Sequence, residues 1–336
     1  MSASQDPGGP AAKASQPLVA TWGEALLRLS PPAGQRLRQA RRLELHVGGS
    51  EANVAVGLAT LGVPSRWLSA VSDDELGETV LAAIRAHGVD VGLVARASAR
   101  TGTYYYDPGN AGRPPSVIYD RAGSAFASMA AGTVAENLLQ GCGQLHLSGI
   151  NLALGAAAAR ATAQVWELAS RLGLRRSFDL NYRSSLGTPA GWVDSCQPFV
   201  TSCDLLFIAE RDARLLYGAA EVGETESLTT LREHAPGAEI VLTRGARGAA
   251  SLSPDGRLTL RPAGKIASLG RIGRGDAFAA GYLASQAREP GNAAAALERG
   301  VAAASYKSAL AGDLAVLDAK SLEELRLGGS DGDVRR

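Results

Sequence analysis

Short apolar runs alternate with longer amphipathic stretches along most of this 336-residue chain, and this alternation restricts the fold more than any other feature. Runs such as Leu18–Trp22 and Glu239–Thr243 have the length and composition of buried strands. Stretches such as Ala156–Leu172, which Gly173 follows, have the length and pattern of helices. Because buried strands separated by helices pair in parallel, the sequence predicts an α/β sheet, mostly parallel and covered on both faces.

The remaining predicted elements follow the same alternation. Ser50 is expected to cap a helix at its amino end, where Glu51 suits the helix dipole. Gly88 is expected to end the helix that covers residues 75–87. We expect further strands at 66–71, 144–148, 175–180 and 204–208, and helices at 51–61, 75–87, 276–287 and 293–311.

Two regions break this pattern because they contain β-rich runs with no helix between them. Residues 103–106 and 116–119 are separated by a loop rich in Gly and Pro, so they should pair antiparallel. We interpret the region around 102–121 as a small β lid over the main sheet. Residues 249–252 and 257–260 are joined through Ser-Pro-Asp-Gly and predict a hairpin.

Composition bounds the class of protein. The chain is 46% hydrophobic and has a net charge of +1, so it can bury a sizeable core and nucleic acid is not a favoured partner. No run approaches the roughly 18 apolar residues of a membrane span. Residues 1–17 lack the apolar core of a signal peptide, which favours the cytoplasm. We expect one domain over 18–327 between disordered tails, 1–17 and 328–336. Without CxxC spacing, three cysteines are expected to be buried free thiols: Cys142, Cys196 and Cys203.

The segment from Gly270 to Phe278 carries the clearest chemistry. Its glycines let the backbone turn with several N–H groups facing one point, and a helix then adds unpaired N–H groups and a positive dipole end. Such a place suits a transferring phosphoryl group, and Asp276 beside it can accept a hydroxyl proton. The structural alternative is an ordinary glycine-rich turn with Asp276 as a helix cap.

Two further segments bring backbone and polar groups to predicted strand or helix ends. Gly48 and Gly49 permit close approach of a ligand, and Asn53 offers a donor and an acceptor to a polyol; the alternative is a tight strand-to-helix turn. Asp179-Leu-Asn-Tyr-Arg183 directly follows a strand, where ligands bind in open α/β sheets. Its guanidinium suits a carboxylate or phosphate, and the alternative is a surface salt bridge.

A last glycine-rich segment, Thr243 to Gly248, follows a predicted strand and either contacts a nucleotide through its backbone or only turns into the hairpin.

Several nucleotide and metal motifs are absent. The sequence contains no GxxxxGK[ST] loop, no HRD or DFG signature, no GxGxxG in a first βαβ unit and no HExxH.

In this order, these segments resemble the ribokinase-like (PfkB) family of carbohydrate kinases, from about Val19 to Leu325. The resemblance implies a three-layer α/β/α sandwich with a β lid, and ATP-dependent phosphorylation of a small sugar. It implies that Asp276 is the general base. The anion hole would be formed by Gly273, Arg274 and Gly275.

Within that family the chain is similar to 2-keto-3-deoxygluconate kinases. The similarity lies in residues 23–32, 119–125 and 181–183, and in Lys307 followed by Gly312-Asp313. It implies an acidic sugar substrate, for whose carboxylate Arg121 and Arg183 would supply positive charge. The sugar would be bound by Gly49, Asn53, Tyr104, Tyr119, Arg121, Arg183 and Asp313. ATP would lie near Asn181, Thr243, Gly245 and Gly248.

The chain departs from the family pattern at two places. Gly270, Arg271 and Arg274 stand where the family has Asp, Thr and Ala. In related kinases that Asp helps to hold a monovalent cation, so dependence on such a cation is left open. The Asn-x-x-Glu motif linked to magnesium is replaced by Ala209-Glu-Arg-Asp212. Mg²⁺ is therefore expected to arrive bound to ATP, with no protein metal ligand assigned.

Three functions remain open on the sequence. The first is a keto sugar acid kinase, and the second is a kinase for another acceptor such as fructose, ribose or a nucleoside. The third is a non-catalytic sugar- or nucleotide-binding protein of the same fold. In relatives the lid often forms a dimer interface, and the aromatic run 104–106 offers such a face, so a homodimer or higher homo-oligomer is a further expectation.

Overall fold

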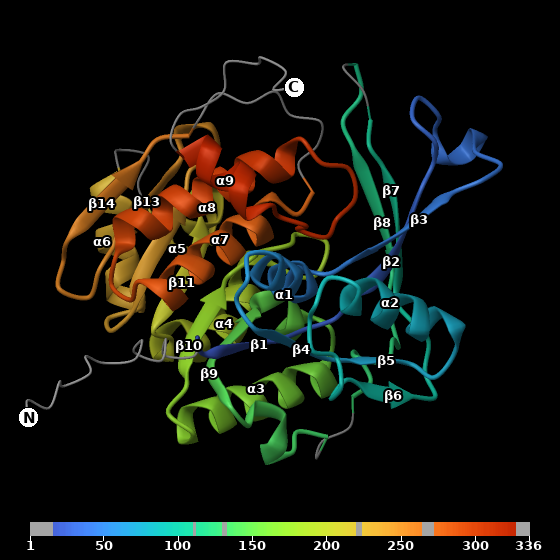
Figure 1. The fold of residues 1–336 in the computed structure, drawn as a ribbon, viewed down its shortest axis with the longest axis horizontal. Coiled ribbons are helices and arrows are strands. Elements are labelled where there is room, and N and C mark those ends of the chain that lie inside the picture. The colour runs from blue at the N-terminus through green and yellow to red at the C-terminus, as the bar shows by residue number, and fades with distance from the viewer. Residues whose placement is uncertain (1–15, 110–111, 130–132, 220–223, 264–271, 327–336) are drawn as a thin grey trace, which may run out of the picture.

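The computed structural model describes residues 16–109, 112–129, 133–219, 224–263 and 272–326. Within them, an eight-stranded sheet runs in the order β14-β13-β12-β11-β10-β9-β1-β4 (Figure 1). All neighbours from β12 to β4 pair in parallel, and the two strands after β12 are antiparallel, as the predicted hairpin requires. The strands are β1 (Leu18–Trp22), β4 (Ser65–Leu68), β9 (Cys142–Ser148), β10 (Arg175–Asp179), β11 (Leu205–Ala209), β12 (Glu239–Thr243), β13 (Ala249–Leu252) and β14 (Leu258–Arg261).

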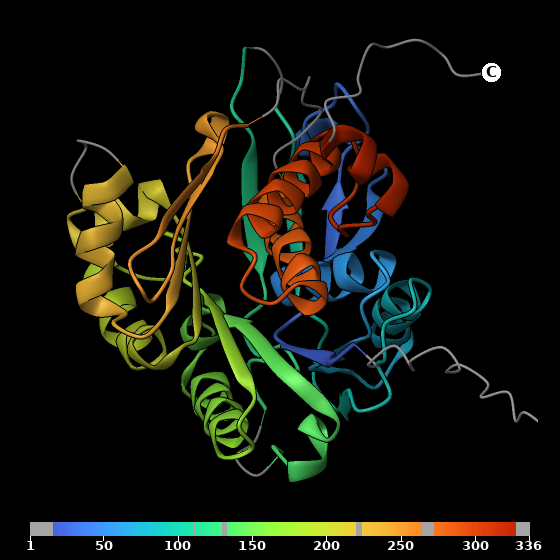
Figure 2. The same cartoon turned by 60° about the vertical axis from the view of Figure 1, so that its left-hand side comes forward.

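Both faces of the sheet are buried, as the continuous apolar strands predict. In β11, Leu206 and Ile208 belong to one hydrophobic cluster, and Leu205 and Phe207 belong to the cluster on the opposite face. The first face is covered by α3 (Ala156–Arg171), α4 (Pro189–Ser202), α5 (Glu210–Tyr217) and α6 (Glu224–His234). The second is covered by α1 (Ser50–Thr60), α7 (Arg274–Arg288), α8 (Ala293–Ser308) and α9 (Ala319–Arg326) (Figure 2). The result is a three-layer α/β/α sandwich.

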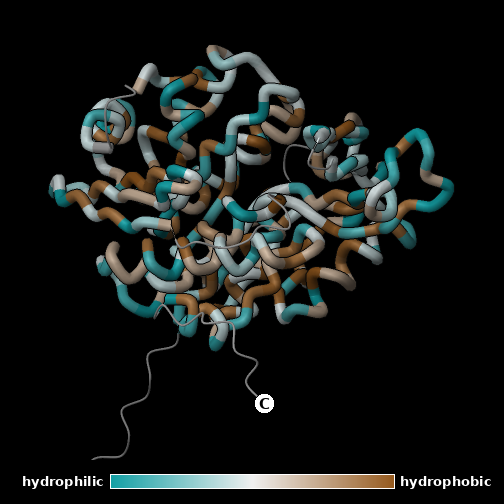
Figure 3. The backbone as a smooth tube through the Cα atoms, turned by 90° about the horizontal axis from the view of Figure 1, so that it is seen from above, coloured by the Kyte–Doolittle hydropathy of each residue, from teal (hydrophilic) through white to brown (hydrophobic). Residues whose placement is uncertain are grey.

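A second sheet rises beside this body and forms the lid. Its strand order is β3-β2-β7-β8, and β7 and β8 are antiparallel, as predicted. In their register Tyr104 lies opposite Tyr119. The lid is larger than the expected region around 102–121, because two earlier strands join it. The strands are β2 (Leu26–Ser30), β3 (Glu44–Gly48), β7 (Thr103–Asp107) and β8 (Ser116–Asp120). From above, the lid extends away from a body whose hydrophobic residues gather inside (Figure 3).

Two local predictions are wrong. The expected single strand 66–71 is broken at Ser69. The residues before Ser69 pair with β1, but the Ser69 carbonyl accepts from the Ala95 amide at 2.9 Å, and the residues after it pair with a different strand. That pair is β5 (Ala70–Ser72) with β6 (Ala95–Ala97), beside α2 (Glu75–Arg85). Ser50 is not the cap of α1: Gly49 occupies that position without a side-chain hydrogen bond, and Ser50 is the first helical residue.

The two tails expected to be disordered lie almost wholly outside the described residues: these are residues 1–15 and 328–336. Among the described helices, none has both the length and the apolar content to cross a membrane. The cysteines are free thiols, as predicted. The predicted burial is confirmed for Cys196 and Cys203 and is wrong for Cys142, which is partly exposed.

Candidate active site

A cavity of about 440 Å³ lies between the lid and the carboxyl ends of the sheet strands. Asp179, Ala209 and Thr243, the last residues of β10, β11 and β12, line it from below. The starts of α1 and α7 and the lid strands complete its walls. This is the edge where ligands bind in open α/β sheets.

Most of the residues singled out from the sequence meet in this cavity. Gly245 and Gly248 do not line it: they form the turn into β13, which was the structural alternative for them. Their contact with ATP stays a prediction. The predicted residues that line the cavity are Gly49, Asn53, Tyr104, Tyr119, Arg121, Asn181, Arg183, Thr243, Gly273, Arg274, Gly275, Asp276 and Asp313.

Asp276 is held where the starts of α1 and α7 meet. The Asn53 side-chain amide donates to its Oδ2 at 2.7 Å, and the Ser50 hydroxyl donates to its Oδ1 at 2.8 Å. Burial raises the pKa of Asp276, and the bonds from Asn53 and Ser50 lower it. A carboxylate with one donor on each oxygen keeps a lone pair free on each, so it can still accept a proton.

The amino end of α7 forms an anion site beside this carboxylate. Gly273 has a φ of 72°, and a Cβ there would lie 2.6 Å from the Asp313 carbonyl oxygen, so the turn requires glycine. The helix begins at Arg274, and its first amides have no partner in a preceding helical turn. The space beside Gly275 is open to 4 Å, and Arg274 is partly exposed on the cavity wall. Amides at the start of a helix, beside space that no described residue fills, suit a phosphoryl group.

Lys307 adds a buried cation behind this anion site. Its Nζ donates to the Gly312 carbonyl at 2.7 Å, and its Cε would lie 3.2 Å from a Cβ on Gly273. Burial, and then the nearby Arg28, lower the pKa of Lys307 to about 8, while Asp276 opposes that shift. The lysine therefore offers its charge to the site while it also supports the Gly312 turn.

The residues expected to bind the sugar differ in whether other protein side chains already occupy their polar groups. Arg121 donates from Nε to Glu24 at 2.8 Å, and Glu24 is buried. Asp313 pairs with Arg28 and accepts the Tyr104 hydroxyl. Both have protein partners in this structure.

Arg183, in contrast, is exposed and has no ion pair with any described residue. Burial raises the pKa of Asp179 and of Asp276, and the charge of Arg183 opposes both rises, so Arg183 lies near Asp276. Of the two arginines expected to meet a carboxylate, Arg183 is the one open to a ligand.

The matching family model settles the class of this protein. The model of the pfkB family of carbohydrate kinases matches residues 16–314. This chain belongs to the pfkB family. The predicted family and fold are thereby confirmed, and the chain is a carbohydrate kinase.

Curated and solved relatives of this pfkB kinase agree. It is 35% identical to 2-dehydro-3-deoxygalactonokinase of Haloferax volcanii, over 94% of this chain and 98% of that protein. It is 31% identical to 2-dehydro-3-deoxygluconokinase of Thermoproteus tenax, over 90% and 92%. The crystal structure of 2-dehydro-3-deoxygluconokinase from Thermotoga maritima superposes with a TM-score of 0.87 at 27% identity, over 93% of this chain and 99% of that one.

Several polar groups of this pfkB kinase's cavity were missed from the sequence. Glu51, taken only as a helix-dipole partner, is buried and accepts from the Asn151 amide at 3.0 Å. Burial raises the pKa of Glu51 to about 7 and that of Asp179 to about 8. Asn151 lies just after β9, so the rule that singled out Asp179, polar residues after a strand, would have found it.

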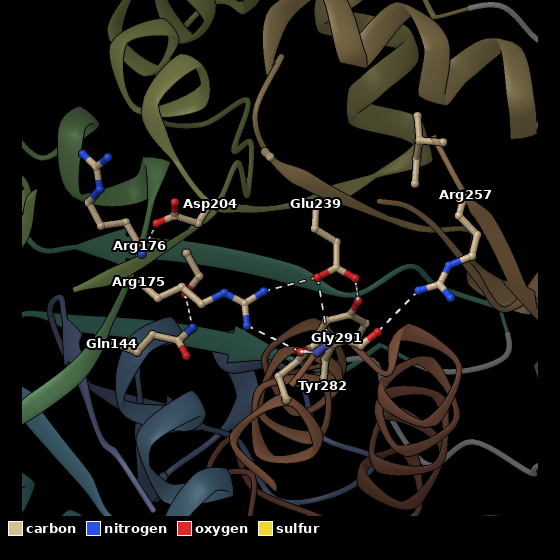
Figure 4. Close-up of polar contacts among 12 residues, drawn as sticks. Gln144, Arg175, Arg176, Asp204, Glu239, Arg257, Tyr282 and Gly291 are labelled. Carbon is tan, nitrogen blue, oxygen red and sulfur yellow. Dashed lines mark hydrogen bonds and ion pairs between the residues drawn. The ribbon is translucent and has the colours of Figure 1, made fainter. Parts of the chain in front are cut away.

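A second polar cluster holds α7 at the amino ends of the strands, opposite the cavity (Figure 4). Glu239, at the start of β12, accepts from the Tyr282 hydroxyl of α7 at 2.5 Å and pairs with Arg175 of β10 at 3.2 Å. Gln286, one turn further along α7, donates to the same carboxylate at 3.4 Å. These contacts hold α7 against the strands, so the start of α7 and its Asp276 have a defined place.

Proposed function

We propose that this kinase transfers the γ-phosphoryl group of ATP to a hydroxyl of a 2-keto-3-deoxy sugar acid, such as 2-keto-3-deoxygluconate or 2-keto-3-deoxygalactonate. The observation that carries the proposal is the pairing, in one cavity, of a held carboxylate, Asp276, with an exposed arginine, Arg183. A neutral sugar has no group that needs this guanidinium, whereas a sugar acid does. The names of the Haloferax and Thermoproteus relatives support the same substrate class.

In the proposed reaction, Asp276 accepts the proton of the attacking hydroxyl. The first amides of α7, from Arg274 to Asp276, face the charge that develops on the transferring phosphoryl oxygens. Arg183 binds the sugar carboxylate and fixes which hydroxyl reaches the base. The lid strands β7 and β8 cover the cavity and exclude water from the phosphoryl group.

Mg²⁺ is proposed to arrive with ATP, where it neutralises phosphate charge. The described residues contain no group of three or more His, Cys, Asp or Glu placed to hold a metal ion. Asp212 is the candidate to face a hydrated ion: its side chain is buried at the cavity wall, and its Oδ1 pairs with Arg211 at 2.7 Å. It would face the ion through the ion's own waters. Gly270 and Arg271, on which the monovalent-cation question depends, lie outside the described residues.

ADP release over a panel of acceptors tests the substrate class. The panel contains 2-keto-3-deoxygluconate, 2-keto-3-deoxygalactonate, fructose, ribose and adenosine, each with ATP and Mg²⁺. The proposal predicts the highest kcat/KM with one of the two keto-deoxy acids. A preference for fructose, ribose or adenosine would contradict it. Calorimetric binding of sugar and ATP without ADP release from any acceptor would favour the non-catalytic alternative.

We further propose that a homodimer forms through the outer face of the lid. Leu45, Leu29, Tyr105 and Ile118 are register partners across all four lid strands, so they form one row. The adjacent residues Tyr104 and Tyr119 face the cavity, so this row faces outward. Leu45 and Ile118 are 49% and 57% exposed. Light scattering should show a dimer that Ile118→Asp dissociates; an unchanged dimer would reject this face.

A cytoplasmic location of this kinase stays a prediction.

A further inference from the structure

The hydroxyl of Ser50 has a role in this structure that the helix cap predicted for it would not explain. Gly49 takes the cap position of α1, which frees the Ser50 side chain. Its hydroxyl instead donates to Asp276 Oδ1 at 2.8 Å, between residues 226 positions apart in the chain. A hydroxyl has a single hydrogen, so this bond uses the only donor that Ser50 has.

The acceptor side of the same hydroxyl is also occupied. The Asn181 side-chain amide donates to Ser50 Oγ at 2.9 Å. An amide NH₂ can only donate, so the two bonds run in one direction, from Asn181 through Ser50 to Asp276. A hydroxyl that accepts a hydrogen bond becomes a stronger donor in its own bond.

The backbone at Asn181 is shaped for this contact. Asn181 has a φ of 45°, the only left-handed non-glycine residue among those described. Its amide N–H donates to Asp179 Oδ1 at 3.1 Å, which stabilises the turn after β10. Asparagine is one of the few side chains that tolerate this conformation. The turn thus aims the Asn181 amide toward α1.

We propose that Ser50 and Asn181 form a two-residue relay that positions the Asp276 carboxylate for proton transfer. This inference rests on the proposed role of Asp276 as the base. It also gives Asn181 a structural task in place of the expected contact with ATP. Neither residue touches the reacting atoms in this account; both act through Asp276.

Other charged groups also face Asp276. Burial raises its pKa, and Arg183, after β10, and Lys307, on α8, oppose that rise. Its own charge raises the pKa of Glu51 on α1 and of Asp179 at the end of β10. None of these groups changes when Ser50 loses its hydroxyl. The bond from Ser50 lowers the pKa of Asp276, so its removal raises that pKa.

The base works in its ionised form, so kcat/KM falls as the pH drops through its pKa. Ser50→Ala should therefore move the acid limb of kcat/KM to higher pH, by about 1 unit for one hydrogen bond to a charged group. Asn181→Gly removes the amide without backbone strain, because glycine adopts positive φ freely, and should move the limb in the same direction by less. Ser50→Thr keeps the hydroxyl and should restore the wild-type limb.

The experiment measures pH profiles of the full chain with ATP and whichever keto-deoxy acid is the better acceptor. Ser65→Ala is the matched control: Ser65 is a buried serine that donates to the Ala55 carbonyl at 2.8 Å, away from Asp276. It should lower stability and leave the limb in place. The double variant Ser50→Ala/Asn181→Gly should shift no further than Ser50→Ala alone, because Asn181 acts through Ser50.

An acid limb unchanged in Ser50→Ala, or additive shifts in the double variant, would overturn the relay. If Ser50→Ala does not fold, an unshifted Asn181→Gly would overturn it instead. Failure of the relay is distinct from failure of the proposed function. The relay fails alone if Asp276→Asn is inactive but Ser50→Ala keeps the wild-type limb. The role of Asp276 as the base fails if Asp276→Asn turns over normally, and the proposed substrate class fails if the kinase prefers fructose, ribose or adenosine.

Discussion

Asn53 and Asp276 stand 223 residues apart in the chain, and the Asn53 side-chain amide donates a 2.7 Å hydrogen bond to Asp276 Oδ2. The bond joins the first turns of α1 and α7, which pack side by side on one face of the sheet. It connects the glycine-rich start of one helix, predicted to meet the sugar, with the glycine-rich start of the other, predicted to meet the phosphate. The proposed chemistry depends on this meeting of two segments.

Replacement of Arg183 tests how the substrate carboxylate is recognised. Arg183→Gln should raise KM for the keto-deoxy acid by about 10- to 100-fold, the value of a charge-assisted hydrogen bond, and lower kcat much less. Arg160→Gln, at an exposed residue of α3, is the control and should change neither constant. Steady-state kinetics would reject the role of Arg183 if both variants kept the wild-type KM.

The turn before α7 can be tested with a matched pair of glycines. Gly273 and Gly88 both have positive φ, 72° and 84°, but only Gly273 has a carbonyl oxygen where a Cβ would stand. Gly88→Ala should lower the free energy of unfolding by about 1 kcal/mol, for backbone strain alone. Gly273→Ala should lower it further and also reduce kcat, because the Cβ displaces the first amides of α7. Urea unfolding and turnover assays measure both effects. If Gly273→Ala and Gly88→Ala lost equal stability and Gly273→Ala kept full activity, the turn before α7 would not need the space that glycine leaves.

Glu51 predicts a pH dependence of stability. Burial raises its pKa to about 7 in the folded protein, above the 4.5 of an exposed Glu. The folded state therefore binds a proton more tightly, and the stability that this contributes is present below pH 4.5 and is lost as the pH rises through 7. Glu51→Gln keeps the acceptor for Asn151 and removes the titration.

We therefore expect the unfolding free energy of wild type to fall relative to Glu51→Gln by about 3 kcal/mol between pH 4.5 and pH 8. Glu167→Gln, at an exposed position of α3, should run parallel to wild type. Denaturant titrations across this pH range provide the measurement. Parallel curves for Glu51→Gln and wild type would show that Glu51 is not protonated in the folded protein near neutral pH.

The fold could be predicted to a large extent because its signals are local. Apolar runs in strands buried on both faces, glycines that follow helices and the Ser-Pro-Asp-Gly turn each depend on a few neighbouring residues. Strands β2 and β3 were missed because each has only five residues, and β2 carries a charged residue, Arg28, whose partner Asp313 comes from the far end of the chain.

The site was predicted as a set of residues and much less as a set of contacts. Asn53, Arg183 and Asp276, which were singled out by the order of the motifs, line one cavity. No local rule indicates that Arg121 is paired with Glu24, or that Ser50 leaves its cap position for Asp276. Such pairings depend on how distant segments pack, which only the folded structure shows.

Turnover of Asp276→Asn tests the central claim most directly. Asparagine keeps the size of the side chain but cannot accept the hydroxyl proton, so kcat with ATP and a keto-deoxy acid should fall by roughly 10²- to 10⁴-fold. Asp194→Asn, at an exposed position on α4, should retain wild-type turnover. If Asp276→Asn also turned over at the wild-type rate, Asp276 would not be the base.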